Sequence, residues 1–295
     1  YNLVECQQYP QYSSRIFDIL EQISPTANVT TRAAILLNFA LLNNIDKNRS
    51  VKLFKVLTAD YDPRLMAMPL HNLNPLLYYI NYAIDELIDY FEHAITTSGG
   101  RKTASVILWL AWYRHQNKMA KDILDRAVKN IDAQVALITF FVQQNMYEAT
   151  AIDYILQFVD VDEPSTELAQ SFDTLFRHLP AKKNAAWEMV RKYAGSKMVL
   201  LQCEGYLAFL NKLAAINPEL TLECITRCAA VVPSNTRAIE AVTDVVLKTY
   251  NSIRKYDDPE MRPELEQAMD ILDKVIEQNH GFANIKKFIH QLDND

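Results

Sequence analysis

The chain of 295 residues carries a net charge of −6, and 49% of its residues are hydrophobic. An acidic chain lacks the overall cationic surface that non-specific nucleic-acid binding requires, and no apolar run is long enough to span a bilayer. Five glycines and four cysteines occur in all. The scarcity of glycine favours helices, where glycine costs about 1 kcal/mol relative to alanine, and the sparse cysteines exclude a disulfide framework and favour a reducing compartment.

Amphipathic helical patterns recur along the whole chain. The first, at residues 13–23, carries apolar side chains at the 3.6-residue period of a helix that buries one face: Ile16, Ile19, Leu20 and Ile23. The others follow at residues 29–43, 48–59, 75–84, 86–95, 102–114, 118–130, 133–144, 147–159, 165–179, 184–194, 197–216, 219–232, 235–253, 263–279 and 282–292. The sequence therefore predicts an all-α fold of roughly sixteen helices. Only the β-branched run at residues 135–142 is ambiguous between helix and strand.

Helix pairs repeat at a spacing of about 30 to 45 residues, the range of HEAT-like and TPR-like arrays. We therefore expect an α-solenoid of HEAT/TPR-like helix pairs, with a closed helical bundle as the structural alternative. The loop region at residues 178–187 indicates a boundary between an array at residues 1–180 and a C-terminal array or capping subdomain at residues 181–295. The run at residues 105–113 is apolar nearly all round, which predicts a helix buried on more than one side.

The only Gly-Gly pair, Gly99-Gly100, precedes Arg101 and Lys102 and raises the question of a phosphate-binding loop. A Walker loop needs a first glycine, four intervening residues and then Gly-Lys-Ser/Thr after a strand. Here Ala94 stands where the first glycine belongs, and the preceding segment is helical. The pattern therefore favours a turn between two helices. Cations in the first turn of the next helix oppose its dipole, which leaves an interaction role open for Arg101 and Lys102.

No other group of residues predicts a catalytic or metal site. The thiols of Cys203, Cys224 and Cys228 are expected to be buried core groups, since zinc sites need two close ligand pairs. The histidines form no pair at metal spacing, and the carboxylate pairs Asp85/Asp89 and Asp122/Asp125 are expected on solvated faces. We therefore expect no cofactor, no nucleotide hydrolysis and no tightly bound metal.

Charge is unevenly distributed along the chain. Residues 97–130 contain seven Lys or Arg against two Asp, a net charge of +5, whereas residues 153–176 contain six acidic residues and no Lys or Arg. Ordinary surface variation with ion pairs between helices explains such a pattern, and a bipolar surface that orients a charged protein partner is the sharper alternative. Aromatic and cationic residues of the kinds that dominate protein interfaces point to one candidate surface: Tyr79, Tyr82, Trp112, Arg114 and Lys118.

Three segments carry a resemblance to a known family: Ser24–Met66, Leu87–Arg114 and Glu266–Asp293. The first has a D-x-x-R-x-x-x-L-F run before a D-P-R-L turn, from Asp46 to Phe54 and from Asp62 to Leu65. The second has an L-x-D-Y-F-E-x-A-I run before Ala-Trp-Tyr, with Asp89 where the family pattern has proline. Together they resemble the C-terminal helical-repeat region of bacterial STAND NTPases of the antiviral Avs type.

That resemblance implies a non-catalytic sensor. In such proteins an effector and an NTPase precede the repeats, and the repeats detect a viral protein. Because the chain begins at Tyr1, we expect those domains upstream in a longer, cytoplasmic protein. The resemblance transfers no catalytic residue.

Two other functions compete with the sensor. One is a generic α-solenoid scaffold or adaptor for protein–protein interaction. The other is a HEAT-like DNA glycosylase, in which the basic segment at residues 97–130, with Trp109 and Trp112, would contact DNA. The acidity of the chain makes nucleic acid a poor expected partner.

Overall fold

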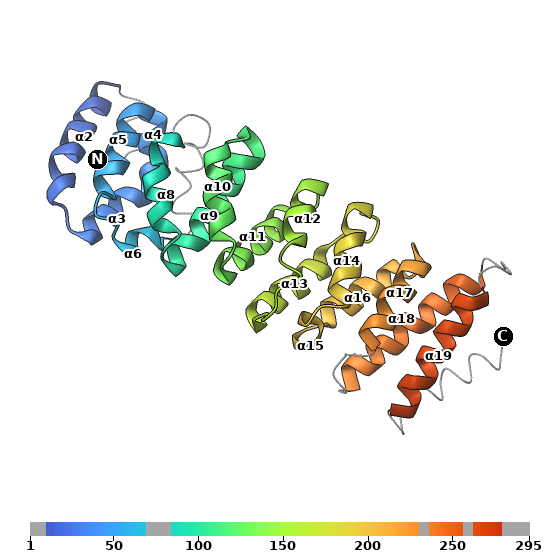
Figure 1. The fold of residues 1–295 in the computed structure, drawn as a ribbon. Helices are drawn as coiled ribbons and strands as arrows, with labels where there is room; N and C mark the ends of the chain where they lie inside the picture. Colours follow the sequence, from blue (N-terminus) through green and yellow to red (C-terminus); the bar gives the residue numbers. More distant parts are fainter. Residues whose placement is uncertain (1–9, 69–83, 230–235, 256–261, 279–295) are drawn as a thin grey trace. The chain divides into compact units, whose positions relative to one another are not determined.

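A computed structural model describes residues 10–68, 84–229, 236–255 and 262–278. These residues form seventeen α-helices and three short 3-10 helices, and no strand occurs among them (Figure 1). The predicted all-α fold is therefore confirmed. The ambiguous run at residues 135–142 lies inside a helix, α11 (Ile131–Gln144).

The chain divides into two compact units, Tyr1–Leu137 and Ile138–Asp295. The division falls within α11, whereas the sequence pattern placed a change of architecture near residue 180. That change, and the continuous solenoid expected for the whole chain, stay predictions.

The first unit arranges its described helices in two layers. One layer holds α2 (Pro10–Ile23), α5 (Lys47–Leu57), α8 (Ile88–Ala94) and α10 (Lys118–Ala127). The other holds α3 (Val29–Leu37), α6 (Pro63–Met66) and α9 (Ser98–His115), with α4 (Phe39–Ile45) bridging α3 and α5. Within a layer each helix contacts the next one along: α2 contacts α5, α8 contacts α10, and α3 contacts α6, which contacts α9. The rings of Phe54 on α5 and Tyr90 on α8 meet edge to face at 5.0 Å.

The second unit repeats this order. One layer holds α12 (Ala149–Leu156), α14 (Trp187–Ala194), α17 (Pro218–Ala229) and α19 (Arg262–Gln278), and each contacts the next. The other holds α13 (Thr166–His178), α16 (Glu204–Leu213) and α18 (Thr236–Arg254), again in sequential contact. The short helix α15 (Met198–Leu201) lies against α13 and α14.

Polar links between successive helices of a layer join residues 27 to 41 positions apart, and several of them span 31 to 34 residues. Asn117 donates to Asp85 across 32 residues, and Arg191 donates to Glu223 across the same 32. Further links span 31 residues (Lys55 to Glu86) and 34 residues (Arg126 to Glu92). Separations of 31 to 34 residues lie close to the period of TPR-like helix pairs, so the packing within the units fits the helical repeat that the sequence spacing indicates.

Side-chain caps mark where seven of the described helices begin. Each cap oxygen accepts a hydrogen bond from a backbone N–H of the first turn, which has no partner within the helix. The residues that do this are Asn28, Asp46, Asp62, Thr97, Asn117, Ser165 and Asn217. Asn217 is followed by Pro218 at the first helical position, as the sequence predicts.

The core of the second unit depends on one close approach between α13 and α16. The carboxylate of Asp173 is almost fully buried and accepts a hydrogen bond from the backbone N–H of Gly205, in the first turn of α16. A side chain on α13 thus caps the neighbouring helix, whose own N-cap residue, Cys203, makes no side-chain cap. A Cβ atom at position 205 would overlap the carbonyl oxygen of Asp173, so only glycine fits.

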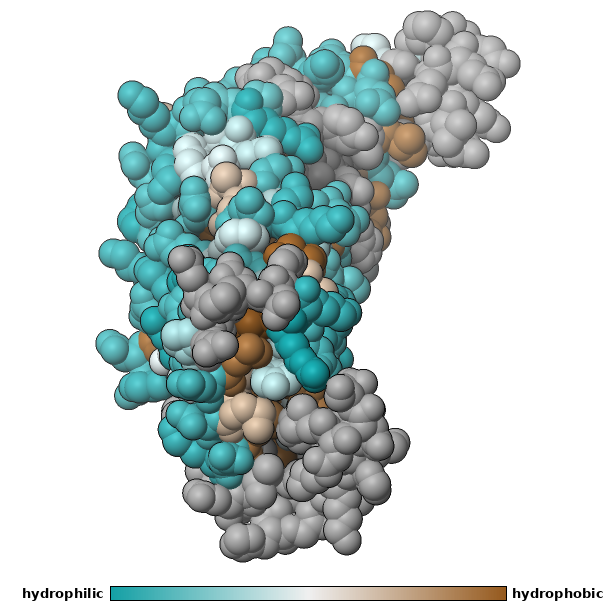
Figure 2. Space-filling model, turned by 90° about the vertical axis from the view of Figure 1, so that its right-hand side faces the viewer, coloured by the Kyte–Doolittle hydropathy of each residue, from teal (hydrophilic) through white to brown (hydrophobic). Residues whose placement is uncertain are grey.

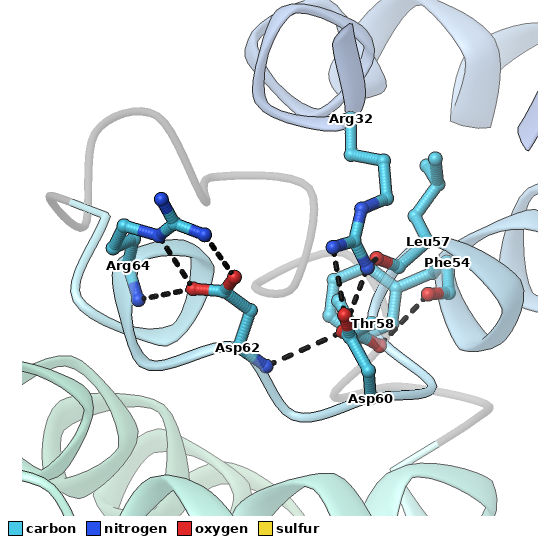
Figure 3. A network of polar contacts seen from close by, with 7 residues as sticks. All are labelled: Arg32, Phe54, Leu57, Thr58, Asp60, Asp62 and Arg64. Carbon is cyan, nitrogen blue, oxygen red and sulfur yellow. Dashed lines mark hydrogen bonds and ion pairs between the residues drawn. The ribbon is translucent and has the colours of Figure 1, made fainter. Parts of the chain in front are cut away.

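In the first unit, Arg32 on α3 holds the end of α5 (Figure 3). Its guanidinium donates to both carboxylate oxygens of Asp60, at 2.6 and 2.7 Å, and to the carbonyl oxygen of Leu57 at 3.0 Å. The hydrogen bonds from Arg32 lower the pKa of Asp60. The Leu57 carbonyl lies at the C-terminal end of α5, where the helix offers it no N–H donor. The buried guanidinium of Arg32 supplies the missing donor.

We expect Gly205→Ala to lower the free energy of unfolding by about 3 kcal/mol, because the added methyl group forces α13 and α16 apart. Gly195→Ala is the matched control: a Cβ there would only touch the Lys192 carbonyl at 3.9 Å. It should change stability by less than about 0.5 kcal/mol. Denaturant unfolding followed by circular dichroism measures both, and equal effects of the two variants would contradict the close-approach argument.

We expect Arg32→Met to destabilise the chain by about 1–3 kcal/mol at pH 7, because the Leu57 carbonyl loses its donor. The folded-state pKa of Asp60 lies below its ordinary value, so the contribution of the pair is complete above about pH 4 and is lost as pH falls through the folded pKa. The gap between wild type and Arg32→Met should therefore narrow at pH 3. Urea titrations at pH 7 and pH 3 measure these free energies of unfolding. The control Arg15→Met, which removes an exposed cation of α2, should change the free energy of unfolding only slightly and equally at both pH values.

Candidate protein-interaction surface

Gly99 and Gly100 allow two helices to pack closely. Both lie in the first turn of α9, after the N-cap Thr97, whose side chain accepts from the Gly100 N–H at 3.3 Å. A Cβ at Gly99 would overlap the side chain of Ala67, and one at Gly100 would approach the Ala94 carbonyl to 2.6 Å. The predicted corner between helices is confirmed, with α9 beginning at Ser98.

Arg101 and Lys102 have structural partners that the sequence did not reveal. Arg101 donates from Nε to the carbonyl oxygen of Ile95 at 2.8 Å, just past the end of α8, and forms an ion pair with Asp132 at 3.2 Å. Lys102 also pairs with Asp132, at 3.5 Å. Arg101 therefore satisfies a carbonyl of the preceding helix, and Asp132 lies in the first turn of α11, where the helix dipole favours an anion.

Of the five predicted interface residues, three lie together around the turn from α9 to α10. Trp112 is half-buried, whereas Arg114 and Lys118 are exposed. We name five residues around this turn that are exposed or half-buried, Trp112, Tyr113, Arg114, Lys118 and Met119, the α9–α10 corner. Tyr79 and Tyr82 lie outside the described residues.

The rings of the α9–α10 corner are held rigidly by the core. Trp109 is fully buried; it meets Trp112 edge to face at 5.0 Å and stacks on Tyr113 at 5.4 Å. On the other side the ammonium group of Lys121 lies 5.1 Å from the centre of the Trp112 ring. Sequence reasoning missed Tyr113 and Lys121, although the spacing of four residues between Trp109 and Tyr113 was a signal that their rings share a helix face.

Most cations of the basic segment at residues 97–130 are already paired. Arg101 and Lys102 share Asp132, Lys121 pairs with Asp125, and Arg126 pairs with Glu92. Within the described part of the chain, Arg114, Lys118 and Lys129 form no ion pair and are exposed. The charge excess of this segment therefore remains available at the α9–α10 corner and at Lys129.

In the acidic segment at residues 153–176, fewer of the charged residues form ion pairs than in the basic segment. Asp173 is buried against Gly205 and Arg177, and Asp160 pairs with Lys192 at 3.4 Å. Asp153 and Glu163 are exposed. The explanation by ion pairs between helices thus holds for part of each charged segment, and the bipolar surface stays a prediction.

The residues that carry the family resemblance hold the fold together. Asp46 caps α5, and Arg49 pairs with Asp18 at 2.8 Å and Glu21 at 2.7 Å on α2. Asp62 caps α6 and accepts from Arg64, and these hydrogen bonds lower the pKa of Asp62 to about 2. The motif in the first segment is therefore explained by helix starts and ion pairs.

The cysteines of the second unit are core groups, as the sequence predicts. Cys203, Cys224 and Cys228 are free and buried. Burial raises the pKa of Cys203 and of Cys224 to about 11, and that of Cys228 well above its usual value. Among the described residues no group of three or more His, Cys, Asp or Glu is placed to hold a metal ion. Cys6 lies outside those residues.

The carboxylate pairs lie on the surface, as expected. Asp85, Asp89 and Asp122 are exposed, and Asp125 is half-exposed beside Lys121.

On the face drawn in Figure 2, hydrophobic residues lie in small groups between hydrophilic ones. No helix in the described ranges has the length and apolar character that crossing a membrane requires.

Comparison with known proteins adds no relative: no family model matches the sequence, and no curated protein or solved structure is significantly similar to it. The structure thus defines an all-α helical-repeat chain with a rigid aromatic and cationic corner.

We expect the three buried thiols to be unreactive in the folded chain. In a Cys6→Ser background, Ellman's reagent at pH 7.5 should modify Cys203, Cys224 and Cys228 only in step with unfolding, because thiolate is the reacting form and burial disfavours it. Rapid reaction of one thiol per native chain would contradict the burial. The same assay in 6 M guanidinium chloride should count three thiols and serves as the control.

Proposed function

We propose that this chain is a non-catalytic helical-repeat module that binds a protein partner, and that the α9–α10 corner contributes to the binding surface. The observation that carries the proposal is that two exposed cations without an ion pair among the described residues lie close in sequence to aromatic rings that the core contacts. Arg114 follows Trp112 and Tyr113 in the last turn of α9, Lys118 begins α10, and the buried Trp109 contacts both aromatic rings.

Such a surface favours protein binding for two physical reasons. Aromatic rings that are already fixed bury apolar area with little loss of conformational entropy, and they are enriched among the residues that dominate interfaces. Cations without counter-charges attract an acidic partner and orient it, and this attraction weakens with salt. The chemistry of the corner thus suits an acidic protein surface with an apolar anchor.

The resemblance to STAND NTPases suggests a more specific form of the proposal. In that version the module is the sensor of an antiviral protein, its ligand is a viral protein, and NTPase and effector domains lie upstream in the full-length chain. The similar segments from Ser24 to Met66 and from Leu87 to Arg114 support this version, as do three free thiols, which suit a cytoplasmic protein.

The two competing functions differ in what supports them. A generic scaffold or adaptor would use the same corner, and only the identity of the partner separates it from a sensor. A DNA glycosylase would need Trp109 to contact DNA, but Trp109 has no exposed surface. Arg101 and Lys102, near the start of the same helix, are engaged with Asp132, so the structure does not favour DNA binding by this segment.

We expect the double charge reversal Arg114→Glu/Lys118→Glu to weaken capture of the cognate protein by at least about tenfold, since two attractive contacts become repulsive. The assay is affinity capture by the immobilised chain from lysates of uninfected and phage-infected bacteria, with mass spectrometry and titration of the captured protein. A partner that appears only after infection supports the sensor, and a host partner supports the scaffold.

The matched control is Lys182→Glu/Lys183→Glu, which reverses two exposed cations in the second unit. It should leave capture unchanged, and circular dichroism should show both double variants to be folded. If the Arg114/Lys118 variant captures the partner as well as wild type does, the corner is not part of the binding surface.

A further inference from the structure

A polar pocket of about 250 Å³ lies between the end of α5 and the start of α8 in the first unit. We name it the α5–α8 pocket. It has room for one amino-acid side chain, since a cavity of about 150 Å³ already holds a benzene molecule. The polar and charged residues on its wall are Lys55, Thr58 and Tyr61 on the α5 side, and Glu86, Asp89 and Tyr90 on the α8 side.

The wall carries one carboxylate that the described residues leave without a counter-ion. The ammonium group of Lys55 lies 3.1 Å from the carboxylate of Glu86, so these two charges offset each other. Asp89 is exposed, and its carboxylate forms no ion pair or hydrogen bond among the described residues. The lining therefore keeps one net negative charge, which favours a cationic ligand.

The hydroxyl of Tyr90 is a second group on the wall that has no hydrogen-bond partner within the described ranges. The side chain is only 6% exposed, and its ring meets those of Phe54 and Phe91 edge to face, at 5.0 and 5.5 Å. Burial raises the pKa of Tyr90, so the hydroxyl stays protonated and can both donate and accept a hydrogen bond. Buried polar groups are rarely left without a partner, and an N–H group in the pocket supplies one.

The wall at Tyr61 is already fixed in shape. Its backbone is left-handed, with φ at 52°, which is uncommon for a residue other than glycine. Its ring stacks on that of His93 at 3.6 Å, with the two planes 5° apart. Strained backbone of this kind is concentrated at ligand clamps and other functional sites. Thr58, just past the end of α5, lines the same pocket, and a helix C-terminus favours a cation.

The sequence shows that this chain has few ways to supply the cation itself. Residues 69–83, which lead to α8, include no Lys or Arg, and no arginine occurs outside the described ranges. Among the described residues, Lys55 is the only cation that lines the pocket, and it is paired. A guanidinium group in the pocket therefore has to come from another molecule.

We propose that the α5–α8 pocket binds a guanidinium group on a short aliphatic stem, with Asp89 as its counter-ion, Tyr90 as a hydrogen-bond partner and Tyr61 as an aromatic wall. A guanidinium fits this wall because it is planar, more weakly hydrated than an ammonium group, rich in N–H donors and able to pack against aromatic rings. The arginine side chain of a protein and a free small guanidinium compound share this chemistry. The proposal does not depend on protein binding by the α9–α10 corner.

The test is isothermal titration calorimetry of the full chain at low ionic strength, where attraction between charges is least screened. One pair of probes is N-acetyl-Gly-Arg-Gly-amide and the same peptide with citrulline, which keeps the shape of arginine without its charge. The other pair is butylguanidine and its neutral counterpart, butylurea. We expect at least one guanidinium probe to bind with a Kd at least about tenfold below that of its neutral counterpart. Tighter binding of the arginine peptide assigns the pocket to a protein partner, and tighter binding of butylguanidine assigns it to a free small ligand.

Variants of the wall locate the binding. Asp89→Asn removes the charge at nearly constant size, and Tyr90→Phe removes only the hydroxyl. Each should raise the Kd of the tighter guanidinium probe by about tenfold, because each removes one partner of a charged group. The matched control is Asp153→Asn, which removes an exposed carboxylate of α12 in the second unit and should leave Kd unchanged. Circular dichroism verifies the fold of each variant.

Two outcomes would overturn the proposal. One is equal binding of each guanidinium probe and its neutral counterpart, or no binding of any probe. The other is binding that Asp89→Asn and Tyr90→Phe leave intact, or that Asp153→Asn weakens as much as they do. The charge reversal Arg114→Glu/Lys118→Glu should not raise Kd, so failure of the α9–α10 corner and failure of this pocket can be told apart.

Discussion

The constraint on which this structure depends is the satisfaction of helix ends. The chain is built from many short helices, and each helix leaves about four N–H groups and four carbonyls without partners in its own backbone. Stacking buries many of these ends. Arg32 satisfies the Leu57 carbonyl at the end of α5, Arg101 the Ile95 carbonyl after α8, and Asp173 the N–H of Gly205 at the start of α16. In each case the side chain comes from another helix.

This use of charge explains which charged residues are left for interaction. In the sequence, Arg101 and Lys102 form a basic pair with no evident structural partner. In the structure, Arg101 donates to the Ile95 carbonyl at the end of α8, and both residues form ion pairs with Asp132. Arg114 and Lys118 form no ion pair among the described residues. They are exposed near the turn from α9 to α10, where Trp109 contacts the rings of Trp112 and Tyr113.

The same logic applies to apolar surface. A helix of a two-layer repeat needs neighbours on both flanks to bury its faces. The helix α9 has them, and its side chains from Thr103 to Ala111 are all buried. In contrast, α2 leaves Ile19 and Ile23 largely exposed. An apolar stripe at helical spacing therefore does not by itself reveal whether its partner lies within the chain or outside it.

The sequence by itself determined the all-α class, the helix-pair spacing, the cap at Asn217, the corner at Gly99-Gly100 and the burial of the three thiols. These features depend on local periodicity, on cap chemistry and on the intrinsic preferences of residue types, which are all encoded within a few residues. It could not determine that Asp173 caps α16 or that Trp109 supports Tyr113 and Trp112 without reaching the surface. Nor could it separate Arg101, which pairs with Asp132, from Arg114, which forms no ion pair among the described residues. Those outcomes depend on which residues about 32 positions apart come into contact, and only the packing of one helix pair on the next decides that.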